Sequence, residues 1–135
     1  MITFDVERLG PWVAGRTGGK YFSGSGQAIG LHRNGELAAA VLYDSFNGRS
    51  VQMHVASDGS KSWMNKAFLL MAFDLPFNQW RVNKIIGLVD STNHEAIRFD
   101  ENIGFHLEHV VTDAGPEGDL LIYSMTRQQC RWIKD

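Results

Sequence analysis

Residues 81–105 constrain the fold more than any other part of the chain. The segment begins with an apolar, β-branched run over residues 82–89, which is typical of a mostly buried strand. Asn93 follows, and its side chain offers an acceptor for the free N–H groups at a helix start. Apolar residues then recur at helical spacing over 96–103, and Gly104 stands where a left-handed helix cap is favoured. The segment therefore predicts strand, short helix and a second strand in direct succession.

Upstream of this segment, the pattern predicts an antiparallel meander. Asn34-Gly35 and Asn47-Gly48 are signals for short hairpins, because type I′ turns need positive φ at both central residues. These two turns divide the region into three strands, which we expect over residues 27–33, 36–46 and 49–57.

The remaining elements complete a mixed α/β pattern. A helix is expected over residues 60–75, with Pro76 ending it. The strands at 49–57 and 82–90 would then be parallel, joined through this helix. Two final strands, over 105–112 and 119–127, form a hairpin. The order is a three-strand meander, helix, strand, helix and two-strand hairpin, in one mixed, mostly antiparallel sheet.

Size and composition fit one α/β domain over residues 1–135, in which 1–25 are expected to be irregular with a helical fragment near 7–14. The formal charge is −2 and basic residues do not cluster, so nucleic acid is not an expected partner. Cys130 is the only cysteine, which excludes an internal disulfide and fits a reducing compartment. No apolar run approaches the roughly 20 residues that cross a bilayer. We expect a cytoplasmic protein without a membrane partner.

The loop before the first long helix is one candidate site. A helix start offers free N–H groups and a positive dipole end to a phosphate, and Ser60 and Ser62 add hydroxyls while Lys61 adds a charge. The alternative is a serine-capped helix that binds nothing.

Histidines supply the other candidates. His54 alternates with Met53 and Val55, so it faces away from them, where it could act as a base or remain a polar strand residue. His106 and His109 are three apart on a predicted strand and should point to opposite faces, so no metal site is expected.

The segment Asn93-x-x-Ala96, followed by Gly104-Phe105, resembles the last helix motif of the GNAT superfamily, the Gcn5-related N-acetyltransferases. Together with the order of elements, the resemblance covers about residues 27–127. The C-terminal strands and the ending Cys130-Arg131-Trp132-Ile133 look similar to small GNAT-like proteins of phages and prophages.

The resemblance implies a fold, a cosubstrate and its site. In this family the strand matching 49–57 splays from the strand matching 82–90, here after Val55, and acetyl-CoA lies between them. The residues implied to hold acetyl-CoA are Met53, His54 and Val55 on the strand, Ser57, Gly59, Ser60, Lys61 and Ser62 in the loop, and Asn93.

The implied reaction is direct attack of an acceptor amine on the thioester, with the N–H of Val55 stabilising the oxyanion. We expect His54 to act there as a base or a water-positioning group. The tyrosine that in the family protonates the departing thiolate aligns with Asp100, and a carboxyl could do so only if burial raises its pKa. Tyr123 is a second possible donor. The acceptor would be an amine on a small molecule or a protein, and a homodimer is implied by family habit. The alternative is a non-catalytic GNAT-like module that binds a CoA-like ligand or a protein partner without turnover.

Overall fold

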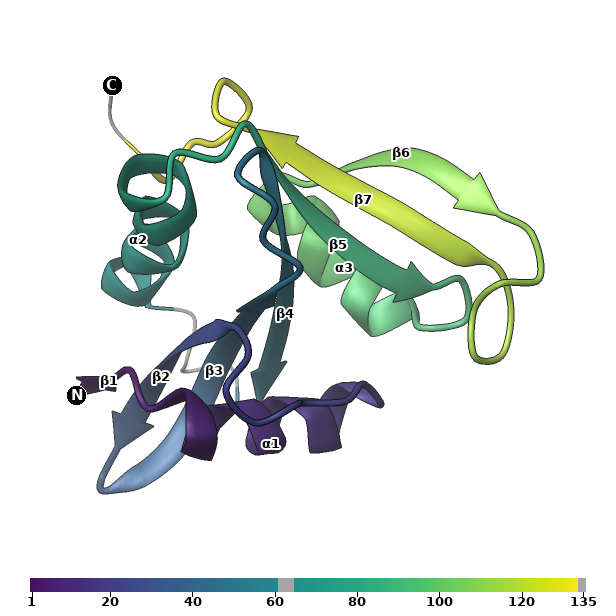
Figure 1. Cartoon of the computed structure of the whole chain (residues 1–135). Coiled ribbons are helices and arrows are strands. Elements are labelled where there is room, and N and C mark those ends of the chain that lie inside the picture. Colours follow the sequence, from purple (N-terminus) through teal and green to yellow (C-terminus); the bar gives the residue numbers. More distant parts are fainter. Residues whose placement is uncertain (61–64, 134–135) are drawn as a thin grey trace.

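A seven-stranded mixed sheet forms the centre of the part of the chain that the computed structural model describes, residues 1–60 and 65–133 (Figure 1). Its strands follow the order β1-β2-β3-β4-β5-β7-β6. They are β1 Ile2–Thr3, β2 Gln27–Arg33, β3 Glu36–Asp44, β4 Ser50–Ser57, β5 Lys84–Asp90, β6 His106–Val111 and β7 Leu120–Thr126. The described helices are α1 Val6–Thr17, α2 Lys66–Asp74 and α3 His94–Ile103, with a π-helical turn over Leu75–Gln79. None of the described helices is both long and apolar enough to span a membrane.

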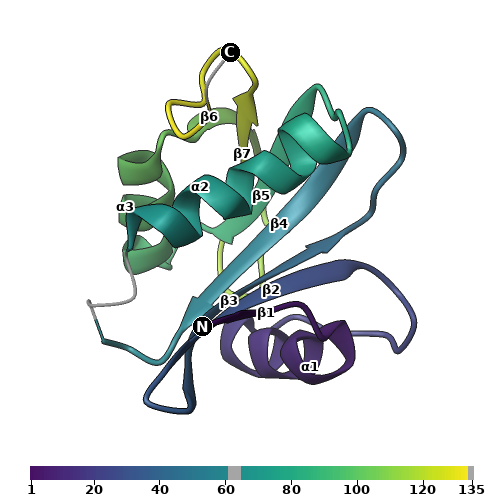
Figure 2. The same cartoon turned by 90° about the vertical axis from the view of Figure 1, so that its left-hand side faces the viewer.

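Helices cover both faces of the sheet. Figure 2 shows α1 on one side of the strands and α2 with α3 on the other. Because side chains alternate along a strand, β3 contributes to two cores. Val41 and Tyr43 belong to the larger core under α2 and α3, whereas Leu42 belongs to a smaller core with Leu9 and Val13 of α1.

The structure confirms the predicted order of elements and the single mixed sheet. β4 and β5 are parallel, and the neighbouring strand pairs are antiparallel. Asn34 and Gly35 have φ of 53° and 80° and join β2 to β3 in a two-residue turn. Asn93 caps α3, accepting a hydrogen bond from the N–H of Ala96 at 3.1 Å, and Gly104 ends it with φ of 114°.

The helical fragment expected near residues 7–14 is present and longer, because α1 spans 12 residues, so residues 1–25 are more regular than expected. Helix propensity is poor there, since the helix includes Gly10 and Pro11. Leu9 and Val13, however, are fully buried against the sheet. Burial of this apolar stripe stabilises a helix that local sequence disfavours.

The predicted type I′ turn at Asn47-Gly48 is also wrong. β3 ends at Asp44 and β4 begins at Ser50, so the connection spans five residues. Asn47 instead accepts hydrogen bonds on its side-chain oxygen from the N–H groups of Arg49 and Ser50, at 2.9 and 2.8 Å. An asparagine side chain that replaces a backbone acceptor stabilises a wider turn.

Both ends of the second helix differ from the prediction. Ser60 is not helical, and α2 is capped by Asn65, whose side chain accepts from the N–H of Phe68 at 2.8 Å. Pro76 does not end the helix but lies inside the π-helical turn that continues to Gln79. The missing N–H of proline is tolerated because the chain changes here to the wider π-helical pattern, in which an N–H bonds to the carbonyl five residues earlier. Trp80 accordingly donates to the carbonyl of Leu75 at 2.9 Å.

Candidate active site at the divergence of β4 and β5

The central strands β4 and β5 pair over only three positions, from Ser50↔Lys84 to Gln52↔Ile86. Beyond Gln52, β4 continues to Ser57 along β3 alone, and β5 continues to Asp90 along β7 alone. Figure 1 shows the two strands diverging along their length. We call residues 53–57 and 87–90 the β4–β5 splay. It begins after Gln52, earlier than the expected position after Val55.

The backbone of β4 turns unpaired amides toward this splay. Just past β4, the N–H of Asp58 donates to the carbonyl of Ala38 at 2.8 Å, so even-numbered residues of β4 direct their N–H groups to β3. Antiparallel ladders alternate the direction of successive residues. The N–H groups of Met53 and Val55 therefore point to the side where β5 has left the sheet.

Asp100 of α3 lies beside the splay. A Cβ atom placed on Gly87, the first β5 residue beyond the paired segment, would be 3.4 Å from the Oδ2 atom of Asp100. Burial raises the pKa of this carboxyl to about 7, and the charge of Glu101 adds to the rise. A carboxyl group that acts as an acid at this position needs a pKa raised in this direction.

Tyr123, the second candidate proton donor, is committed elsewhere. It pairs with Gly87 across the β5–β7 ladder and is buried. Its hydroxyl donates to Oε2 of Glu101 at 2.9 Å. Burial and this hydrogen bond raise the pKa of Tyr123 to about 12.

His54 lies on the opposite face from Asp100 and is hydrogen-bonded to Asp44. Met53 faces the larger core, so His54 faces the α1 side, as its alternation predicted. Its Nε2 atom is 3.1 Å from both carboxylate oxygens of Asp44. Asp44 was not identified from the sequence, because the contact depends on cross-strand register: His54 is opposite Leu42, two residues from Asp44 on the same face.

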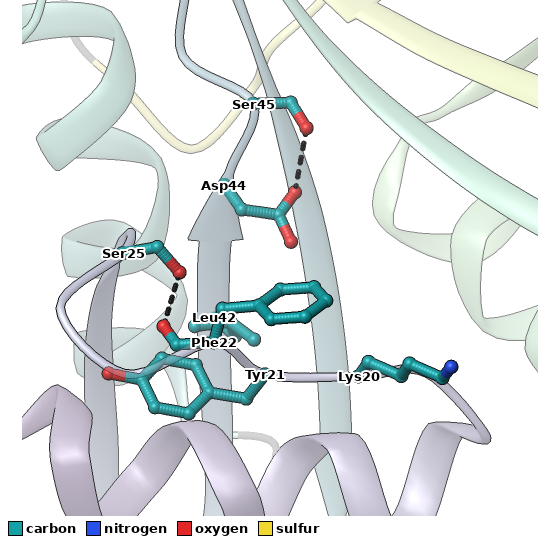
Figure 3. A pocket seen from close by; sticks show the side chains of 7 residues that line it. All are labelled: Lys20, Tyr21, Phe22, Ser25, Leu42, Asp44 and Ser45. Atoms are coloured by element: carbon teal, nitrogen blue, oxygen red, sulfur yellow. Dashed lines mark hydrogen bonds between the residues drawn. The ribbon is translucent and has the colours of Figure 1, made fainter.

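A pocket of about 270 Å³ adjoins Asp44 on the same side of the sheet (Figure 3). Two parts of the chain form it, the end of β3 and the segment between α1 and β2. That segment belongs to the part expected to be irregular, and no sequence motif marks it. The lining residues are Lys20, Tyr21, Phe22, Ser25, Leu42, Asp44 and Ser45.

The loop predicted to bind pyrophosphate is closed by its own hydrogen bonds in its described part. The hydroxyl of Ser57 accepts from the N–H of Gly59 at 3.2 Å, and Oδ1 of Asp58 accepts from the N–H of Ser60 at 2.9 Å. Hydrogen bonds from the side chain and backbone of Ser60 lower the pKa of Asp58. The predicted residues Lys61 and Ser62 lie outside the described residues.

The expectation that His106 and His109 point to opposite faces is wrong. A bulge between Leu107 and His109 leaves His106 opposite Ser124 and His109 opposite Ile122, so both share one face. Over residues 1–60 and 65–133, no group of three His, Cys, Asp or Glu side chains is arranged to hold a metal ion.

Comparison with solved structures decides the fold. Mutant forms of the spermidine/spermine N-acetyltransferase SpeG from Vibrio cholerae superpose with a TM-score of 0.73 at 12% identity, over 95% of this chain and 96% of theirs. A probable acetyltransferase superposes with a TM-score of 0.65 at 19% identity, over 77% and 62%. The chain has the GNAT fold. No known family profile and no curated protein matches the sequence.

The GNAT fold accounts for the main feature of the site, since the splayed pair β4 and β5 is the one the resemblance singled out. It places Asp100 on the helix that carries the motif and Asn93 at the start of that helix. The similarity to phage-encoded GNAT proteins, drawn from the C-terminal strands, stays a prediction.

Proposed function

We propose that the protein is an acetyl-CoA-dependent N-acetyltransferase that transfers the acetyl group to an amine by direct attack. The observation that carries the proposal is the β4–β5 splay, with a protonatable carboxyl on one side and a histidine–carboxylate pair on the other. The GNAT fold supports it, and the neighbouring structures are N-acetyltransferases.

The residues present fit the cosubstrate. Met53 and Val55 offer main-chain N–H groups without a partner strand on the β5 side, as the amides of a pantetheine arm require. Ser57, Gly59 and Ser60, with Lys61 and Ser62, would hold the pyrophosphate once the N–H groups of Gly59 and Ser60 exchange their present partners, Ser57 and Asp58, for it. Asn93, at the start of α3, would contact the pantetheine arm. Bound there, acetyl-CoA supplies a thioester carbonyl to the acceptor amine.

Three side chains would handle protons. His54 would accept the proton of the attacking amine, while Asp44, bonded to Nε2, orients the imidazole ring and stabilises its charged form. Asp100 would donate its proton to the departing thiolate on the other face. The N–H of Val55 would stabilise the oxyanion of the tetrahedral intermediate.

Calorimetry with acetyl-CoA, followed by a thiol-release assay over a panel of primary amines and peptides, tests the proposal. We expect micromolar binding and amine-dependent release of CoA. Absence of acyl-CoA binding would overturn the proposal.

A non-catalytic module is the second candidate, favoured by two observations. Asp100 occupies the place of the family's tyrosine, and Asp58 brings a negative charge to the loop that would bind pyrophosphate. Acetyl-CoA binding without transfer to any amine would select this candidate.

We further propose a homodimer. β6 is an edge strand whose residues are all exposed, including Leu107 and Val110. Such an edge can pair with a second chain. One neighbouring structure, a spermidine N-acetyltransferase from Vibrio cholerae, is dodecameric. Size-exclusion chromatography with light scattering measures the molar mass in solution, which distinguishes a monomer from a homodimer.

A further inference from the structure

The pocket beside Asp44 lies one strand away from the β4–β5 splay. Leu42 and Asp44 of β3 form one side of it, and Leu42 is the cross-strand partner of His54. Since β4 stands between β3 and β5, a molecule seated in the pocket crosses only β4 to reach the splay. Neighbouring strands are about 4.8 Å apart, so a chain of a few atoms spans that distance and passes His54.

The opposite wall is hydrogen-bonded to Glu7 of α1. Glu7 accepts hydrogen bonds from the hydroxyl of Tyr21 at 2.9 Å, the hydroxyl of Ser23 at 2.9 Å and the N–H of Gly24 at 2.7 Å. The ring of Tyr21 packs so closely on Gly10 that a Cβ atom there would be 2.4 Å from it. Phe22 therefore projects from an anchored segment while remaining 70% exposed. Its ring lies between Asp44 and Lys20 in Figure 3.

The lining combines apolar surface with one acidic and one basic side chain. Tyr21, Phe22 and Leu42 supply two aromatic rings and an aliphatic side chain. Asp44 is the one acidic residue that lines the pocket, and its carboxylate contacts His54 at 3.1 Å and Ser45 at 3.3 Å. The positive charge of Lys20, which also lines the pocket, repels a second cationic group on a bound ligand. A cavity of about 150 Å³ holds benzene, so the pocket's volume of about 270 Å³ accommodates an aromatic ring with a short alkyl chain.

We propose that this pocket is the acceptor subsite and that it selects a primary monoamine with an aromatic or similarly apolar body over a polyamine. The body would pack on Phe22, Tyr21 and Leu42, while the amine would face Asp44 and His54 at the edge of the splay. The acetyl transfer in this inference rests on the proposed function, whereas the binding of an apolar amine in the pocket does not. It differs from the acceptor named for the neighbouring structures, because a polyamine needs several negative groups and this lining offers one.

Acceptor competition tests the selectivity. With acetyl-CoA saturating, 2-phenylethylamine, butylamine and spermidine are compared by kcat/KM. We expect 2-phenylethylamine to exceed both others by about tenfold, the scale of burying one ring against aromatic and apolar side chains. Preference for spermidine would overturn the inference while leaving the transferase proposal intact.

Phe22→Ala tests whether the selectivity for the aromatic amine arises in this pocket. The variant should lose about tenfold in kcat/KM for 2-phenylethylamine, mainly through KM, with little change for butylamine. Phe4→Ala is the matched control, because Phe4 is also exposed, at 56%, and does not line the pocket. Equal effects of the two substitutions would contradict the assignment.

A binding measurement separates the inference from the proposed function. Titration of the full chain with 2-phenylethylamine should shift the backbone NMR signals of Phe22 and Asp44, and Phe22→Ala should weaken the binding about tenfold. If this binding occurs in a protein that does not bind acetyl-CoA, the pocket assignment stands and the transferase proposal fails. Absence of binding overturns the pocket assignment.

Discussion

The carboxyl group of Asp100 couples folding to pH in a direction opposite to most carboxylates. Its folded pKa of about 7 lies above the ordinary value of about 3.9, so the folded protein binds the extra proton across this window. Stability should therefore fall as the pH rises from about 4 to 7. Asp100→Asn should be more stable than the wild type at pH 8, by on the order of 2 kcal/mol, and similar to it near pH 4. Urea denaturation at both pH values measures the difference, with Asp113→Asn as an exposed control.

The same substitution should change the kinetics. If Asp100 is the acid, kcat of the wild type falls above pH 7, as the carboxyl loses its proton. Asp100→Asn should remove this descending limb and lower kcat at pH 6 by about 100-fold, the usual contribution of a general acid. A descending limb that persists in the variant would show that another group supplies the proton.

His54 and Asp44 should act as one unit. His54→Gln removes the base and is expected to lower kcat about 100-fold, whereas Asp44→Asn should lower it less because the base remains. The double variant should be no slower than His54→Gln, since residues that act through one another are not additive. A thiol-release assay gives the three values, and His106→Gln on the edge strand is the control. Additive losses would contradict the coupling.

At the scale of elements, Asp90 joins the end of β5 to the β6–β7 hairpin. Its Oδ1 atom accepts from the N–H and hydroxyl of Thr92 at 2.8 and 2.6 Å, and its Oδ2 atom accepts from the N–H groups of Glu117 and Gly118 at 2.7 and 3.1 Å. The hydrogen bond from the Thr92 hydroxyl, then that from Glu117, holds the pKa of Asp90 well below its ordinary value.

Asp90→Asn should therefore destabilise the protein at neutral pH by several degrees in Tm. A depressed folded pKa contributes stability above the ordinary value near 4, and that contribution is lost as the pH falls below it. The wild type should lose Tm steeply between pH 4 and 2, and the variant should lose less. Circular dichroism melts measure both, and Asp113→Asn, in the exposed loop between β6 and β7, controls for the charge change. Parallel pH profiles of Asp90→Asn and the wild type would refute the role of the carboxylate.

Elements with strong local signals were predictable from the sequence. Asn34-Gly35 needs positive φ at both positions, and Asn93 and Gly104 satisfy the ends of α3, so local chemistry alone specifies these features. Only residues 7–14 of α1 were expected to be helical, because the stability of this helix comes from burial of Leu9 and Val13 rather than from propensity. The π-helical continuation through Pro76 was missed because proline normally ends a helix.

At the scale of the whole molecule, the candidate site was only half predictable. Asp100 and the residues of β4 could be named as candidates because they belong to a motif or a strand pattern. Asp44 and Phe22 were not, because their placement depends on strand register and on packing against α1. Contacts between residues that are far apart in the sequence produce no periodic pattern from which they could be predicted.

The splay divides the sheet into two halves joined through three residue pairs of β4 and β5, and this arrangement predicts a pattern of hydrogen exchange. The N–H groups of His54 and Ala56 point to β3 and should exchange slowly, whereas those of Met53 and Val55 point into the splay and should exchange rapidly. Saturating acetyl-CoA should slow Met53 and Val55 by at least about tenfold while leaving His54 and Ala56 nearly unchanged, because a ligand that supplies acceptors takes the place of the absent strand. Residue-resolved NMR exchange measures all four amides in one sample. Slow exchange of Met53 and Val55 without ligand, or no response to acetyl-CoA, would mean that these amides do not form the cosubstrate site.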